Sequence, residues 1–168
     1  APRLVGVSHF THNHAAAMRL YRHARAAAPR AVVVAGGEQV THLAAAILAR
    51  ASQLDAVVRG EGETALLEIA RRLAGGRDWR EAPGLSLRAA GAVLRRACPP
   101  PVAALDDCYP LERFSATEGV RAEEQFPFVV TSRGCPGRCT FCDTPTFWGR
   151  RLRLRSVASV VAEIRHLM

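Results

Sequence analysis

The feature that most constrains the fold is a threefold alternation of short apolar runs and longer helix-type segments over roughly the first 75 residues. The apolar runs are continuous, which is typical of strands buried on both faces of a parallel sheet. The expected strands are residues 4–8, 31–35 and 55–58, and the expected helices are about residues 14–28, 42–52 and 64–74, with Asn13 and Thr41 as N-caps. This alternation predicts an α/β, Rossmann-like (flavodoxin-like) domain with a parallel sheet and helices on both faces. Because the chain opens directly in a strand, we expect this domain to be incomplete at its N-terminus.

The pattern changes after the third helix. Residues 84–88 and 92–95 are two apolar runs around a short glycine-containing stretch, which predicts a β-hairpin. Cys98–Pro101 is proline-rich, stiff and extended. We therefore expect the α/β domain to cover residues 1–96 and an interdomain linker to cover residues 97–122.

A second domain is expected from residue 123 to residue 168. Phe126–Ser132 has the apolar character of a short buried strand. Ser156 is a favourable N-cap for a helix that continues to the last residue. We therefore expect this domain to be truncated within a helix.

Three of the five cysteines lie between the predicted strand and this helix, with the spacing C-x3-C-x2-C: Cys135, Cys139 and Cys142. Arg133 and Arg138 add positive charge, which favours thiolate over thiol. A structural zinc ion normally takes four protein ligands, and no fourth ligand lies nearby in the sequence. A disulfide with one spare thiol is an alternative. An iron–sulfur cluster with three cysteines would keep one iron open for a substrate.

The formal net charge is +8, and all 23 basic residues are arginine. Most are scattered; a nucleic-acid binding site would need a concentrated patch with aromatic residues or a known module. We therefore expect no nucleic-acid partner. No apolar run in this sequence is long enough to cross a membrane, and we expect no signal peptide. Thiols arranged as metal ligands are typical of a reducing compartment, so a cytoplasmic protein is predicted.

With Phe141 directly before the third cysteine, the cysteine pattern resembles that of the radical S-adenosylmethionine (radical SAM) family. The resemblance implies that Cys135, Cys139 and Cys142 hold a [4Fe–4S] cluster whose open iron binds S-adenosyl-L-methionine, with Phe141 close to that cofactor. It implies that residues 123–168 form the first strand, loop and helix of a partial (β/α) barrel. It also implies an electron donor such as flavodoxin or ferredoxin.

The first domain carries a second resemblance. Ser8–Phe10 and Gly36–Gly37, twenty-five residues apart, are similar to the Ser-x-Leu and Gly-Gly motifs of cobalamin-binding domains, with phenylalanine in place of leucine. Val33–Gly37, Asp55–Glu63 and Pro83–Leu85 resemble the N-terminal domain of cobalamin-dependent radical SAM proteins. The loops after the strands meet at one sheet edge, where such folds bind ligands. The residues expected to contact cobalamin are Ser8, Thr11, Gly36, Gly37, Gly60, Glu61 and Gly62.

Together the resemblances imply an enzyme that uses a [4Fe–4S] cluster, S-adenosyl-L-methionine and cobalamin on a small-molecule or natural-product substrate. They favour a methyltransferase that acts on an unactivated carbon. Cyclases, oxidases and rearrangement enzymes of this family share the same N-terminal part and are alternatives. A non-catalytic cobalamin- or metal-binding module is an alternative from a different functional class. No catalytic residue is assigned beyond the three cluster ligands.

Other polar residues have simpler interpretations. His9, His12 and His14 alternate across a loop and are expected at the surface or the sheet edge. Glu61 belongs to a structural turn, and Glu63 is expected in the first turn of a helix, where its charge favours the helix dipole.

The remaining cysteines and the basic segment after the cysteine pattern also have structural interpretations. Cys98 and Cys108 lie in the predicted linker and are expected to be reduced thiols outside any ligand set. Trp148 and the arginines in residues 150–155 are expected to pack, with substrate contact as the alternative.

Overall fold

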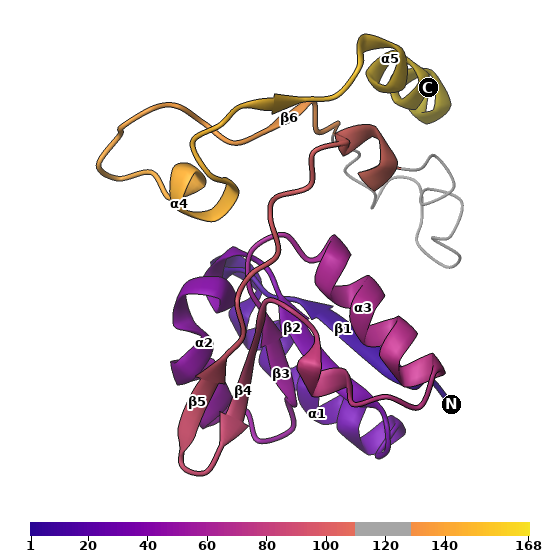
Figure 1. Ribbon diagram of the computed structural model, residues 1–168, viewed down its shortest axis with the longest axis vertical. Helices are drawn as coiled ribbons and strands as arrows, with labels where there is room; N and C mark the ends of the chain where they lie inside the picture. Colours follow the sequence, from indigo (N-terminus) through magenta and orange to yellow (C-terminus); the bar gives the residue numbers. More distant parts are fainter. Residues whose placement is uncertain (110–128) are drawn as a thin grey trace. The chain divides into compact units, whose positions relative to one another are not determined.

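The computed structural model describes residues 1–109 and 129–168. The chain divides into two compact units, Ala1–Pro100 and Pro101–Met168 (Figure 1). The boundary lies beside the run of prolines that the sequence predicts to be extended. Among the described residues, no helix combines the length and the apolar character that crossing a bilayer requires.

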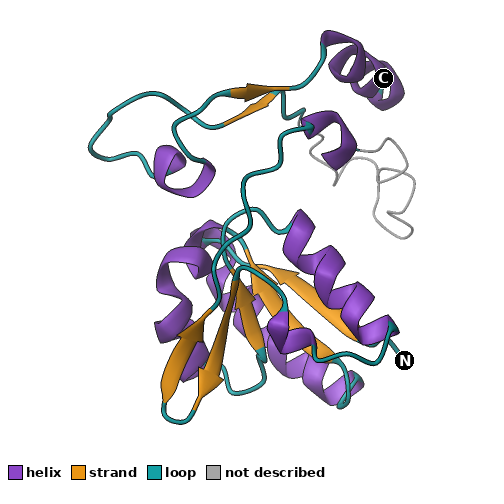
Figure 2. Ribbon diagram, viewed as in Figure 1, coloured by secondary structure: helices purple, strands orange, loops and turns teal. Residues whose placement is uncertain are grey.

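The first unit is built on one five-stranded sheet with the order β1-β2-β3-β4-β5 (Figure 2). The first three strands are parallel, β4 is antiparallel to β3, and β5 is antiparallel to β4. The strands are β1 (Leu4–Ser8), β2 (Val32–Gly36), β3 (Ala56–Val58), β4 (Leu85–Ala89) and β5 (Ala92–Arg95). The predicted Rossmann-like α/β fold is confirmed, with the hairpin extending the parallel strands into a mixed sheet.

The predicted hairpin turns tightly at Ala90–Gly91. Ala89 pairs with Ala92, so only two residues connect the strands. Both turn residues have positive φ, 43° for Ala90 and 82° for Gly91. This conformation matches the right-handed twist of the two strands, and the glycine adopts it without steric cost.

Three helices cover the sheet: α1 (His14–Ala27), α2 (Glu38–Arg50) and α3 (Glu63–Ala74). The expected bounds of α1 and α3 agree to within one residue. The prediction for α2 was wrong at its start, because Thr41 lies inside the helix and Gly37 is the N-cap. Asn13 does stand at the N-cap of α1, but its side chain accepts from Phe10 N and donates to Ser8 O instead.

Each face of the sheet has its own core. Odd-numbered residues of β1 and β2, such as Val7 and Val33, pack with α1 and α2 around the buried Tyr21. On the other face, Val32 and Val34 pack with α3 and with Trp79 of the short 3-10 helix η2 (Trp79–Glu81). Figure 1 shows the same layers, with α3 on the opposite side of the sheet from α1.

The second unit contains a two-stranded antiparallel sheet and short helices. Its elements are η3 (Leu105–Cys108), β6 (Ser132–Arg133), α4 (Thr144–Trp148), β7 (Arg153–Leu154) and α5 (Val157–Leu167). Of the predicted strand Phe126–Ser132, residues 126–128 lie outside the described residues, as do residues 110–122 of the predicted linker. Residues 129–131 are not in a strand, so the strand begins later than expected. Ser156 caps α5 as predicted, accepting from Ser159 N.

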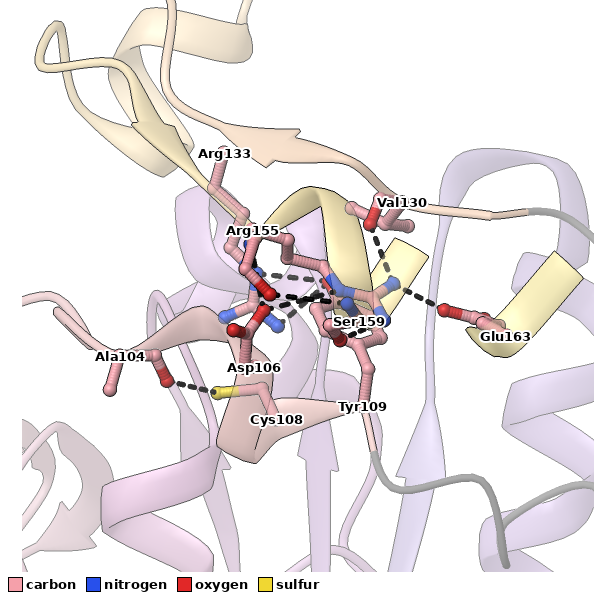
Figure 3. Close-up of polar contacts among 10 residues, drawn as sticks. Ala104, Asp106, Cys108, Tyr109, Val130, Arg133, Arg155, Ser159 and Glu163 are labelled. Carbon is pink, nitrogen blue, oxygen red and sulfur yellow. Dashed lines mark hydrogen bonds and ion pairs between the residues drawn. The ribbon is translucent and has the colours of Figure 1, made fainter. Parts of the chain in front are cut away.

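A buried polar network holds the second unit together (Figure 3). The guanidinium of Arg155 pairs with Glu163 of α5, and both side chains are 0% exposed. Arg155 also donates to Ser159 Oγ and to the Val130 carbonyl. Its Cζ lies 4.7 Å from the ring centre of Tyr109. Because charged groups are costly to bury unless paired, these contacts fix α5 against β7 and the segment after η3.

Candidate functional site

The carboxyl edge of the parallel strands carries a cavity of about 340 Å³. We name it the glycine slot. Its lining comes from the ends of the three parallel strands, the loops that follow them and the first turn of α3. The lining residues are Gly6, Val7, Ser8, Val34, Gly36, Gly37, Val58, Gly60, Gly62 and Leu66.

The slot exists because side chains are missing on one face of the sheet. Gly6, Ser8 and Gly36 share the face that α3 covers, since side chains alternate along a strand. Ser8 pairs directly with Gly36 in the sheet. A Cβ added at Gly6 or Gly60 would have no described heavy atom within 4 Å beyond its chain neighbours. The sheet and α3 therefore leave room for a flat or elongated group to reach the backbone.

The β1–α1 loop and the β2–α2 turn interlock beside the slot. His9 N donates to Gly36 O at 2.8 Å. Gly37 has φ 122°, and an added Cβ would lie 2.7 Å from His9 O. Only glycine meets both conditions, because φ in this range is strained for other residues and the His9 backbone has no space to withdraw.

Thr41 connects this turn to the third loop of the edge. Its hydroxyl donates to Gly37 O at 2.8 Å and accepts from Gly60 N at 3.0 Å. Threonine in the first turn of α2 thus acts as a brace between two loops that line the slot.

Replacing Thr41 with valine keeps the shape but removes both hydrogen bonds. We expect the variant to lose about 1 to 2 kcal/mol of unfolding free energy, the cost of leaving two partly buried partners unsatisfied. Urea denaturation followed by the fluorescence of Trp79, in a Trp148→Phe background, measures this loss. Thr64→Val, at an exposed position of α3, is the control. A loss equal to that of the control would show that the brace is not formed.

Five of the seven residues predicted to contact cobalamin line the slot: Ser8, Gly36, Gly37, Gly60 and Gly62. Thr11, in the 3-10 helix η1 (Thr11–Asn13), and Glu61 are not among its lining residues. The other five lining residues were not predicted: Gly6, Val7, Val34, Val58 and Leu66. The alternation of side chains along β1 places Gly6 on the face of Ser8, and this signal was present in the sequence.

His9 lies at the sheet edge directly after β1, one of the two places predicted, but it is not at the surface, because 0% of the residue is exposed. Its ring Nδ1 lies 2.5 Å from Tyr21 Oη and its Nε2 lies 2.9 Å from His14 Nδ1. Burial, followed by the neighbouring His14, lowers the pKa of His9 below its ordinary value of 6.5. Burial also raises the pKa of Tyr21. His12 is exposed, as expected.

The lowered pKa of His9 predicts that the first unit loses stability in mild acid. Below pH 6.5 the unfolded chain binds the His9 proton more readily than the folded unit does, so the unfolding free energy falls as the pH falls through this range. Urea midpoints of a Trp148→Phe background, in which only Trp79 reports, would measure this between about pH 7.5 and about pH 5.5. His9→Gln should show a flatter profile, and a wild-type profile equally flat would contradict the prediction.

The predicted cluster ligands lie on one loop between β6 and α4. Gly134 has φ 89°, and an added Cβ there would overlap the Arg151 carbonyl. Cys135 N donates to Gly149 O at 3.0 Å, which ties the start of the loop to its far side. Arg150 donates to Gly137 O at 2.7 Å. The backbone of this cysteine loop, residues 134–143, is therefore held at several points.

Two of the thiols lie around Gly137. A Cβ added to Gly137 would be 3.2 Å from Cys135 Sγ and 3.9 Å from Cys139 Sγ, and Gly137 N donates to Cys135 Sγ at 3.4 Å. In the described ranges, no group of three or more His, Cys, Asp or Glu side chains is gathered closely enough to hold a metal ion. Phe141 is 91% exposed beside Cys142.

Several other residues that the sequence singles out take structural roles. Trp148 lies with its ring centre 4.7 Å from Arg133 Cζ, and Arg133 is buried. Cys98 and Cys108 are not in disulfides, as predicted. Glu63 stands in the first turn of α3, also as predicted.

Residues 1–70 match the family model for the B12 binding domain. An uncharacterized methyltransferase of Pyrococcus horikoshii is 35% identical over 139 residues, which are 79% of this chain and 29% of that protein. The anaerobic magnesium-protoporphyrin IX monomethyl ester cyclase of Rubrivivax gelatinosus is 31% identical over 99% of this chain and 31% of that protein. The chain thus spans about a third of the length of these relatives.

The fold is also similar to a solved structure. The radical S-adenosylmethionine methyltransferase TsrM from Kitasatospora setae has a TM-score of 0.77 and 24% identity, over 99% of this chain and 35% of that chain. Another structure of TsrM has cobalamin and a [4Fe-4S] cluster bound. Residues 1–70 thus belong to the B12 binding domain family, and nearly the whole chain is similar in fold to a radical SAM methyltransferase that has been solved with cobalamin bound.

Proposed function

We propose that the chain binds cobalamin in the glycine slot and a [4Fe–4S] cluster through the cysteine loop, as part of a radical SAM methyltransferase. The observation that carries this proposal is the slot itself. A cavity of about 340 Å³ lies at the carboxyl edge of the parallel strands, within the residues that match the B12 binding domain, and four glycines and a serine that the sequence singles out are among its lining residues. Cobalamin is a bulky, polar ligand that needs such access to the backbone.

The residues of the slot fit the proposed cofactor. Gly6 and Gly60 leave space that any Cβ would fill, and the Ser8 hydroxyl can hydrogen-bond to a polar group that enters. The wall formed by Val34 and Val58 is apolar, so that an elongated group would be held by contact on one side and by the backbone on the other. Thr11 and Glu61 are proposed as contacts at the rim, outside the slot.

The donor set of the cysteine loop fits an iron–sulfur cluster in its chemistry. Cys135, Cys139 and Cys142 supply three soft thiolate donors, and the Gly137 amide already donates to Cys135 Sγ. The thiols are not gathered into one ligand group, so that cluster binding requires the loop to close around it. Phe141 is proposed to cover S-adenosyl-L-methionine, a role compatible with its exposure.

When bound, the cluster and S-adenosyl-L-methionine supply the radical that removes a hydrogen atom from carbon, and cobalamin supplies the methyl group. The chain itself binds and orients these groups. We assign residues 1–96 to cobalamin binding, residues 97–122 to the linker and residues 123–168 to the start of the radical SAM domain. Methyl transfer is favoured because the Pyrococcus relative and TsrM are both named methyltransferases. A small-molecule substrate, a flavodoxin or ferredoxin as electron donor, and a cytoplasmic location complete the proposal.

The test uses the full-length gene product, produced without oxygen, with its cluster reconstituted and cobalamin supplied. It is incubated with S-adenosyl-L-methionine, a reductant and a small-molecule extract, and nucleoside products are quantified by mass spectrometry. We expect 5′-deoxyadenosine and S-adenosylhomocysteine together, and S-adenosylhomocysteine should vanish when cobalamin is omitted. Formation of 5′-deoxyadenosine alone would contradict methyl transfer. The absence of both products would contradict an enzymatic function.

A further inference from the structure

Three buried or half-buried side-chain rings are joined by hydrogen bonds next to the glycine slot. None of them is among the lining residues of the slot. Tyr21 Oη meets His9 Nδ1, and His9 Nε2 meets His14 Nδ1. His9 and Tyr21 are fully buried, whereas His14 is half-buried at the first turn of α1. The three rings are close, with centres 5.8 Å apart for His9 and Tyr21 and 4.9 Å apart for His9 and His14.

The backbone of His9 connects these hydrogen-bonded rings to the residues that line the slot. His9 directly follows Ser8, whose side chain points to the opposite face of the sheet, into the slot. The His9 amide donates to Gly36 O, and its carbonyl lies against Gly37. A change in the position of the His9 ring would therefore move Ser8 and the two glycines that line the slot.

The hydrogen bonds of the rings are directional and depend on protonation. A neutral imidazole has one N–H, so His9 donates through one nitrogen and accepts through the other. A proton added to His9 would make both of its ring nitrogens donors, so neither could accept a hydrogen bond from Tyr21 or His14 any longer. The amide of Gln39, from α2, also faces His9, and its Oε1 has no hydrogen-bond partner among the described residues. The groups that face His9 are thus Tyr21 and His14 from α1 and Gln39 from α2.

We propose that the Tyr21–His9–His14 hydrogen-bond chain is a positioning device for cobalamin: it fixes the β1–α1 loop so that Ser8 and Gly37 fit the cofactor, and acid weakens the fit. This inference rests on the proposed function. It assigns no contact between these rings and cobalamin; they act through the backbone of His9.

The test titrates cobalamin into the 168-residue chain and follows its visible spectrum. Tyr21→Phe keeps the ring and removes only the hydroxyl, which leaves a buried nitrogen of His9 without a partner. We expect it to raise the Kd for cobalamin about tenfold, as the loss of one buried hydrogen bond predicts. The Kd of the wild type should rise between about pH 7.5 and about pH 5.5. His9→Gln, which keeps hydrogen-bonding groups but cannot take up a proton, should flatten that rise.

Ile47→Val is the matched control, because Ile47 belongs to the same core cluster as Tyr21 but to none of the ring contacts. It should lower stability without changing the Kd or its pH profile. A positioning role is overturned if Tyr21→Phe binds cobalamin like the wild type, or if its loss merely equals that of Ile47→Val. It is also overturned if His9→Gln keeps the full pH dependence.

Amide hydrogen exchange separates this inference from the proposed function. The His9 amide, bonded to Gly36 O, should exchange faster in Tyr21→Phe than in Ile47→Val, with no cobalamin present. If the wild type binds no cobalamin, the proposed function fails. Equal exchange of the His9 amide in the two variants would overturn the positioning role, whether or not cobalamin binds.

Discussion

Replacement of Cys135, Cys139 or Cys142 with alanine, one at a time, is expected to abolish cluster binding. A [4Fe–4S] cluster held by three protein thiolates has no spare ligand, so the loss of one leaves two, too few to retain it in water. After anaerobic reconstitution, iron and acid-labile sulfide should fall from about four per chain to near zero, and the visible absorbance of the cluster should disappear. This is the largest change that we predict for any single substitution.

The chain provides its own controls for the cysteine variants. Cys98→Ala and Cys108→Ala also remove a thiol, but these residues lie outside the cysteine loop and are not in disulfides. Both should retain the full iron content. Circular dichroism of every variant checks that the α/β unit stays folded. Iron retained by any loop variant, or lost from a control variant, would contradict the assignment of the ligands.

Gly6→Leu is expected to weaken cobalamin binding strongly without loss of stability. Gly6 lies in β1 with its missing side chain directed into the glycine slot, and an added Cβ meets no described atom within 4 Å. A leucine side chain would therefore occupy the slot and not the core. We expect the Kd for cobalamin to rise about 100-fold, the upper end of what overpacking costs. The melting temperature should stay equal or rise slightly, because glycine within a strand costs about 0.5 to 1 kcal/mol.

Two variants sharpen this experiment. Gly6→Ala fills less of the slot and should have an intermediate effect on the Kd. Val5→Leu adds a methylene on the same strand, but its side chain packs with the core of the opposite face and should leave cobalamin binding unchanged. If Gly6→Leu bound cobalamin as tightly as Val5→Leu does, cobalamin would have to bind elsewhere.

Much of the first unit could be predicted because its strands are short, valine-rich and punctuated by glycine. The run Val32–Ala35 is fully buried, and continuous burial gives a signal that does not depend on register. The hairpin was predictable from its glycine turn. The start of α2 could not be predicted, because threonine is a residue type that is common at N-caps. Only the hydrogen bonds of Thr41 to Gly37 and Gly60 show its role as a brace.

The candidate site was predictable in part for the same reason. Glycines and a serine after parallel strands indicate a ligand edge, and five of seven expected residues line the slot. The burial of His9 could not be foreseen, since a polar residue such as histidine directly after a strand is typical of an exposed loop. Its partner Tyr21 lies twelve residues away on α1, and only packing of that helix against β1 brings them together. The second unit was less predictable because its strands, β6 and β7, have two residues each.

The most direct measurement of the central claim is amide hydrogen exchange of this chain with and without cobalamin. We predict that cobalamin slows exchange at residues 6–8, 36–37 and 60–62, which lie at or just after the ends of three separate strands and meet at the glycine slot. Protection of all three segments in the wild type, and of none in Gly6→Leu, is the result that the account requires. Protection confined to the β4–β5 hairpin, or no protection at saturating cobalamin, would contradict it.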